Sequence, residues 1–224
     1  MTTIQPKTFA FLKALKKNNN RDWFNDHKSE YENAKDNVLG FIQELVVAFS
    51  TFDSSLRGLE AKDCLFRIYR DTRFSKDKTP YKTNLGASIN AGGKKSMGPG
   101  YYVHLEPGGS FIAGGIWMPP ADEVKKIRQE IDYNFSDFKK ILANKKFKAV
   151  YGDISRSAEY TLTRVPKGYE ADNPAADFLK LKSFVALAPM KDADLTSKDL
   201  VKKTVAAFEA LQPLVHFINH ALAE

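Results

Sequence analysis

The segment YYVHLEPGGSFIAGGIWM, residues 101–118, decides the fold class of this chain. Residues 101–106 and 110–118 are rich in aromatic and branched side chains, and Pro107-Gly108-Gly109 between them is typical of a tight turn. We therefore expect two antiparallel strands joined as a hairpin. The pair Gly114-Gly115 within the second strand indicates a bulge or the close approach of another backbone.

Further strands are expected on both sides of this hairpin. Residues 65–70 and 85–90 precede it, and residues 160–165 and 183–190 follow it; each is a short run with a strand-like pattern. Strands gather in the middle of the chain and helical patterns flank them. The sequence therefore predicts an α+β fold, with a central, mainly antiparallel β-sheet flanked by several helices.

The flanking helices follow from apolar residues repeated every three to four positions. Residues 8–17 form a short first helix, and an apolar stripe from Phe24 to Phe52 predicts a long N-terminal helix of about 30 residues. A similar stripe predicts a C-terminal helix capped by Thr196. Pro119-Pro120 opens a helix after the hairpin, because proline suits the first helical turn.

Bulk composition favours one domain over residues 1–224. The formal net charge is +7, from 34 bases and 27 acids, an excess that does not by itself indicate a nucleic-acid-binding protein. The single cysteine, Cys64, excludes an internal disulfide and is expected to be a buried, inert thiol. No apolar run approaches the ~18 residues of a membrane span, so we expect a cytoplasmic protein with no membrane partner.

The segment FRIYRDTRFSKDKTPYKTN, residues 66–84, carries the strongest functional pattern. Between Arg67 and Lys82, six bases face two acids, which gives a net charge of +4. Guanidinium groups recognise oxyanions with paired hydrogen bonds. We therefore expect an anion clamp at the end of the strand, with Arg67 on the opposite face unless the strand bulges. Its ligand contacts are Arg67, Arg70, Arg73 and Lys82, with Tyr81 as a hydroxyl donor.

A structural interpretation of the same run stays open. Asp71 could anchor Arg70 or Arg73, and the bases could tie a long loop to acids elsewhere. Two further bases at element ends, Arg164 and Lys182, are added as candidate ligand contacts because such ends often face one cleft.

Tyr102, His104 and Glu106 alternate along one strand and so share one face of it. Histidine titrates near neutrality and a neighbouring carboxylate tunes it, so His104 and Glu106 are the candidate catalytic acid–base pair, with Tyr102 as a ligand contact. The alternative is an ordinary exposed polar strand face. Sequence motifs for phosphate loops, dinucleotides, hydrolase nucleophiles and clustered metal ligands are absent, so we expect neither a metal nor a cofactor.

Four segments together resemble the domain-of-unknown-function 2461 family of uncharacterised bacterial and fungal proteins. They extend from Phe11-Leu12 to His27-Lys28, from Phe66 to Asn84, from Tyr101 to Pro107, and over Asp172-Asn173-Pro174 with Lys182-Ser183-Phe184. The resemblance covers nearly the whole chain, and it implies no activity, cofactor or catalytic residue.

The leading functional hypothesis is a site for a small phosphorylated or other anionic ligand, held by the Arg/Lys-rich strand and loop. Whether acid–base catalysis accompanies binding is left open, as is the oligomeric state. The alternative hypothesis is a non-catalytic module that binds nucleic acid or another protein. Phe74, Tyr69 or Tyr102 would then stack on bases while the cations neutralise phosphates.

Overall fold

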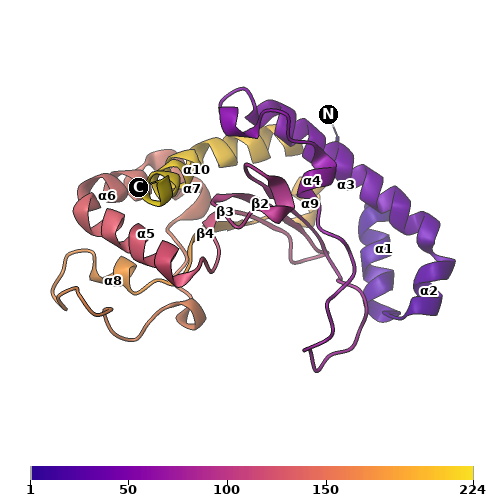
Figure 1. Ribbon diagram of the computed structural model, residues 1–224. Helices are drawn as coiled ribbons and strands as arrows, with labels where there is room; N and C mark the ends of the chain where they lie inside the picture. The colour runs from indigo at the N-terminus through magenta and orange to yellow at the C-terminus, as the bar shows by residue number, and fades with distance from the viewer. Residues whose placement is uncertain (1, 224) are drawn as a thin grey trace. The chain divides into compact units, whose positions relative to one another are not determined.

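The computed structural model describes residues 2–223, and Figure 1 shows their helices and strands. These residues contain a four-stranded antiparallel sheet in the order β1-β2-β3-β4, with a long helix in each terminal part of the chain, which confirms the predicted α+β class. The strands are β1 (Leu85–Ile89), β2 (Gly100–Leu105), β3 (Phe111–Ile116) and β4 (Phe184–Pro189). The helices are α1 (Pro6–Lys17), α2 (Arg21–Asp26), α3 (Lys28–Phe49), α4 (Ala61–Cys64), α5 (Ala121–Tyr133), α6 (Phe135–Ala143), α7 (Lys145–Tyr151), α8 (Ala176–Leu179), α9 (Asp192–Leu195) and α10 (Leu200–Ala223).

The chain divides into two compact units, which are described separately. Unit 1 comprises Met1–Ser96, Tyr102–Ile112 and Pro189–Val205, and unit 2 comprises Met97–Tyr101, Ala113–Ala188 and Ala206–Glu224. The single domain expected over residues 1–224 stays a prediction, because compactness within each unit does not test whether the two fold together. No helix within residues 2–223 is both long and apolar enough to cross a membrane.

The N-terminal helices of unit 1 follow from local capping and burial. Asn20 caps α2, accepting a hydrogen bond at 2.9 Å from the backbone N–H of Trp23. The single helix of about 30 residues is wrong, because α2 ends at Asp26 and α3 begins at Lys28. Between them His27 leaves the helical conformation; its ring stacks on Trp23 with centroids 4.0 Å apart, and its Nδ1 lies 2.8 Å from the Trp23 carbonyl oxygen.

The predicted strand at residues 65–70 is wrong as a continuous element. Only two isolated antiparallel bridges form there, Leu65 with Ala87 and Tyr69 with Tyr81.

A change of register between these two bridges explains the break. The Lys82 N–H donates to the Ile68 carbonyl at 2.7 Å, whereas the Phe66 N–H donates to the Gly86 carbonyl at 2.9 Å. Between these two hydrogen bonds, one segment runs two residues, from Phe66 to Ile68, while its partner runs four, from Lys82 to Gly86. The two extra residues, 83–84, form a bulge that interrupts the ladder. Such a bulge is the condition under which side chains from this segment can be redirected toward one site.

Two further boundaries differ from expectation. The strand predicted at residues 160–165 is reduced to one bridge, Thr161 with Leu181, because the chain turns at Pro166, whose carbonyl accepts from the Tyr169 N–H at 3.3 Å. Thr196 does not cap the last helix; its hydroxyl donates to the Ala193 carbonyl at 3.1 Å and ends α9.

The predicted close approach at Gly114-Gly115 is confirmed within unit 2. Gly115 has φ +114°, and a Cβ there would lie 3.0 Å from the Phe184 carbonyl carbon and closer to its oxygen. A Cβ on Gly114 would collide with Leu211 of α10. Glycine is therefore required at these two positions of β3, where Gly115 meets β4 and Gly114 meets α10.

Candidate functional site

Strand β2 separates a buried face from a polar one. Tyr102, His104 and Glu106, which we call the polar row, are partly exposed. The alternating residues on the other side, Tyr101, Val103 and Leu105, are at most 1% exposed. The row is thus aligned by the two-residue period of the strand, as the sequence predicts.

Hydrogen bonds connect the three side chains of the polar row. The Tyr102 hydroxyl lies 3.2 Å from His104 Nδ1, and His104 Nε2 lies 3.3 Å from Glu106 Oε2. An ionised carboxylate can only accept, so both contacts are satisfied when Nε2 carries the proton and Nδ1 accepts from the phenol. The row therefore links a hydroxyl, an imidazole and a carboxylate, the elements of a proton relay.

Glu106 is the centre of the hydrogen bonds at this end of the row. Its Oε1 accepts from Lys16 Nζ at 3.4 Å, at the end of α1, and from the Thr83 hydroxyl at 3.3 Å, in the bulge before β1. Burial alone would raise the pKa of the Glu106 carboxyl, but the hydrogen bonds from His104, Lys16 and Thr83 outweigh it and hold the pKa below its ordinary value. Glu106 is therefore anionic at neutral pH.

Aromatic rings hold the polar row in place. The His104 ring stacks on Phe111 of β3, with centroids 4.6 Å apart and planes 10° apart. The Tyr102 ring packs against Phe66 and Phe111, with centroids 6.5 and 5.8 Å away. Burial raises the pKa of the Tyr102 phenol, so this hydroxyl stays protonated and able to donate.

Lys82 and the polar row share one neighbour, the ring of Phe66. The Lys82 Nζ lies 5.5 Å from the centre of the Phe66 ring, which also packs on Tyr102. Within residues 2–223, the Lys82 ammonium makes no hydrogen bond or ion pair, although the side chain is only partly exposed. Burial, and then the nearby charge of Arg67, lowers the pKa of Lys82. Lys82 is thus a half-buried cation to which the described residues offer no counter-charge.

The arginines expected to form the clamp have other partners. Arg70 donates to Asp77 at 2.6 Å and to the Thr79 carbonyl at 3.1 Å. Arg73 forms a two-pronged pair with Asp71, at 3.0 and 2.7 Å, and its side chain is 77% exposed. The structural alternative in which Asp71 anchors an arginine is therefore realised for Arg73. Ligand contact by either arginine stays a prediction, since it requires sharing with these acids.

The remaining predicted contacts lie in different surroundings. Arg67 is exposed. The Tyr81 ring is buried against Phe24, with centroids 4.0 Å apart and planes 13° apart. In unit 2, Arg164 is exposed and Lys182 donates to the Glu159 carbonyl at 3.2 Å. Their roles as ligand contacts stay predictions.

The structure adds residues to the site that the sequence pattern did not indicate. Thr83 and Lys16 reach Glu106 from distant parts of the chain. Phe111 could have been found from the hairpin, because a side chain just after the turn can face the alternating residues of the preceding strand. Residues 2–223 contain no group of three or more His, Cys, Asp or Glu side chains that could hold a metal ion.

Comparison with known proteins identifies one family. The family described as "Conserved hypothetical protein (DUF2461)" matches the chain over residues 7–217, which includes the whole polar row and the basic segment. Neither a curated protein nor a solved structure matches the chain.

Proposed function

The chain belongs to the conserved hypothetical protein family DUF2461, and we propose that it binds a small phosphate-bearing or other anionic ligand beside the polar row of β2. Lys82 supplies the positive charge, Tyr102 donates a hydrogen bond, and His104 with Glu106 can accept or return a proton. The family description assigns no activity, so the proposal rests on the geometry and charges of unit 1.

The Lys82 ammonium, which has no ion-pair partner within residues 2–223, carries this proposal. Burying a cation without a partner costs free energy, and its lowered pKa reflects that cost. Structural lysines are ordinarily solvated or paired with an acid, as Lys62 is with Glu60 at 2.7 Å. A ligand oxyanion would provide the counter-charge that the described residues do not offer to Lys82.

The hydrogen-bonded row favours acid–base chemistry on a bound ligand. When His104 Nδ1 takes a proton through the Tyr102 hydroxyl, the resulting imidazolium lies 3.3 Å from Glu106, whose carboxylate stabilises it. The carboxylate also fixes the tautomer before reaction, because it accepts only from Nε2–H. Binding without catalysis would use the same Lys82 and Tyr102 but would not require His104.

Calorimetry with defined anions tests the binding step. Inorganic phosphate, pyrophosphate, ribose 5-phosphate and AMP form a first panel, since a ligand of the folded state also raises thermal stability. For a ligand that binds, Lys82→Met is expected to weaken binding by about 1.5–3 kcal/mol, the usual value of a hydrogen bond to a charged group. Lys62→Met, which removes an exposed lysine that already has an acid partner, is the matched control.

Stability measurements on the same variants separate a functional lysine from a structural one. Because the folded state lowers the pKa of Lys82, its charged form is disfavoured by folding, and Lys82→Met should keep or raise the melting temperature. Intact folding combined with unchanged affinity would reject the proposal. If Lys82→Met still binds the anion but His104→Ala does not, the anion does not contact Lys82, and this part of the proposal is also rejected.

The alternative, a non-catalytic nucleic-acid-binding or protein-interaction module, makes a different prediction about salt. Binding of a polyanion weakens linearly on a double-logarithmic plot of affinity against salt, with a slope set by the number of phosphate contacts. A small ligand held by one lysine should show a shallow slope.

A further inference from the structure

The loop at residues 71–79, which we call the basic loop, is closed by its own side chains. Figure 1 shows it as a long excursion between α4 and β1, with its two arms side by side. Arg70 ties the first arm to the second through Asp77 and Thr79. Lys78 Nζ donates back to the Thr72 carbonyl at 2.9 Å. The loop is therefore held in one shape by cross-links between its arms.

The basic loop presents an aromatic ring to solvent. Phe74 is 95% exposed, the highest value among the large apolar residues that are exposed in residues 2–223. Its only ring partner in that part of the chain is the Arg73 guanidinium, 5.8 Å from the ring centre. A phenylalanine so exposed contributes nothing to a core, and the cross-linked arms of the loop hold its backbone away from the rest of the chain's apolar residues.

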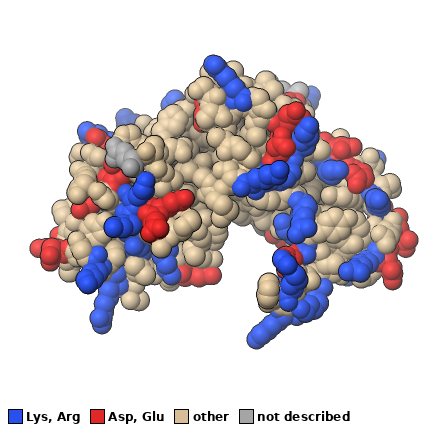
Figure 2. All heavy atoms as spheres, in the orientation of Figure 1, with Lys and Arg blue, Asp and Glu red and all other residues tan. Residues whose placement is uncertain are grey.

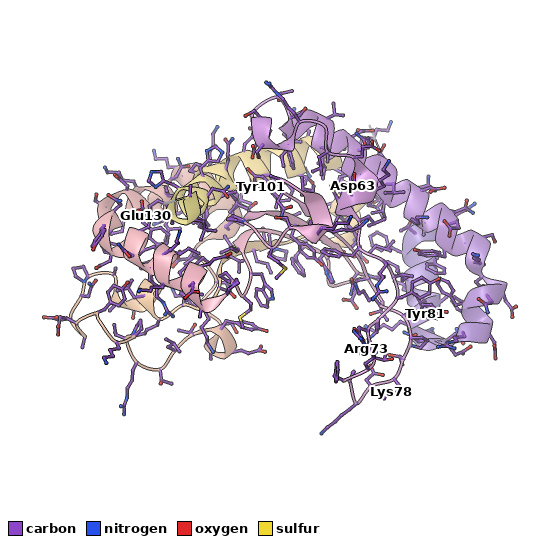
Figure 3. All side chains as sticks on the ribbon, viewed as in Figure 1. Asp63, Arg73, Lys78, Tyr81, Tyr101 and Glu130 are labelled. Atoms are coloured by element: carbon purple, nitrogen blue, oxygen red, sulfur yellow. The ribbon has the colours of Figure 1, made fainter. Side chains whose placement is uncertain are left out.

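The charge around this ring is positive and available. Asp71 is paired with Arg73 and Asp77 with Arg70, so both acids of the loop are already used. Lys76 is exposed and makes no hydrogen bond or ion pair within the described chain. Figure 2 shows Lys and Arg atoms covering much of this loop, and Figure 3 places Arg73 and Lys78 on it.

We propose that the basic loop is a docking element for single-stranded nucleic acid, with Phe74 stacking on a base while Lys76 and its neighbours contact phosphates. An exposed ring between cations is the combination that sequence-tolerant binding of single strands uses. A lipid surface fits less well, because Phe74 is the only apolar residue from 71 to 79 and two acids accompany it. The inference uses other residues than the proposed small-ligand site, since neither Lys82 nor the polar row belongs to residues 71–79.

Fluorescence anisotropy with labelled oligo-dT and oligo-U tests the proposal on the full chain. Phe74→Ala is expected to weaken binding about 5- to 150-fold, the effect of losing one base–aromatic stack, without changing the salt slope. Lys76→Ala should reduce that slope by about 0.7, the value for one phosphate contact on a single strand. Val47→Ala and Lys62→Ala, at an exposed apolar residue and an exposed lysine of the same unit, are the matched controls.

The outcomes decide between the occupants. Saturable binding that falls with salt and is lost in Phe74→Ala supports the inference. No binding, equal binding by Phe74→Ala, or a preference of the loop for phosphatidylserine vesicles over oligonucleotides would overturn it. Phe74→Ala tests this inference and Lys82→Met tests the small-ligand proposal, so the failure of one and the failure of the other are read from different variants.

Discussion

The Tyr102 phenol lies over Gly86 of the neighbouring strand, in the space that a side chain at residue 86 would fill. A Cβ at Gly86 would be 3.2 Å from Tyr102 Cζ and 3.3 Å from Cε2, and closer still to the hydroxyl oxygen. Real Cβ atoms rarely approach other atoms so closely, so the phenol can reach His104 only because residue 86 is glycine.

Gly86→Ala is therefore expected to displace Tyr102 and to destabilise the protein by about 1–3 kcal/mol, the usual cost of overpacking. Urea denaturation measures this loss, and Ser88→Ala on the same strand is the control. The double variant Gly86→Ala/Tyr102→Phe, which removes the closest contact, should be more stable than the sum of the single effects predicts. Additive effects would show that the phenol does not depend on Gly86.

Asn19 predicts a second measurable effect, because its amide mimics a strand partner for Tyr81. Asn19 Nδ2 donates to the Tyr81 carbonyl at 2.9 Å, and the Tyr81 N–H donates to Asn19 Oδ1 at 3.1 Å. Asn19→Ala leaves both backbone groups without these partners and should cost about 1–3 kcal/mol of unfolding free energy. Asn18→Ala, which removes one bond to its own helix, should cost less. Equal losses would contradict this role for Asn19.

Glu106 predicts a dependence of stability on pH. Hydrogen bonds hold the pKa of its carboxyl below the ordinary value of 4.5 despite burial. The folded pKa is lower than the unfolded pKa. The ionised carboxylate therefore stabilises the fold fully at pH values above the unfolded pKa, and this contribution is lost as pH falls through the folded pKa. Glu106→Gln should be less stable than the native protein by about 1 kcal/mol at neutral pH. The difference should shrink on acidification; a constant gap in urea titrations across acidic pH would contradict this prediction.

Local patterns predict much of this fold, because helix and strand periodicities are written in neighbouring residues. The hairpin of β2 and β3 and the polar row follow from alternation within residues 101–118. The break at His27 does not follow from the apolar stripe, since the stripe continues through it. Thr196 is a good helix-capping residue by type, and only the presence of α9 just before it decides that it ends one helix instead of starting the next.

The parts of the site that the sequence did not predict depend on contacts between distant residues. Thr83 meets Glu106 because the bulge at residues 83–84 shifts the register, and register depends on pairing rather than on composition. The partners of Arg70 and Arg73 lie within the same run, yet acid–base spacing alone could not decide between internal pairing and an open clamp.

Cys64 predicts a chemical test of the fold around the site. Burial raises the pKa of its thiol to about 11, and Asp63 adds to the effect. Since the thiolate is the reactive form, two units above the ordinary value of 9.0 correspond to about 100-fold less thiolate near neutral pH. Native protein should therefore react with a thiol reagent at least about 100-fold more slowly than protein unfolded in guanidinium. The variant Cys64→Ala/Ser54→Cys, with its thiol at an exposed position, should react at a rate close to that of the unfolded chain. Rapid modification of native Cys64 would mean that α4, which precedes the basic run, opens readily in the folded protein.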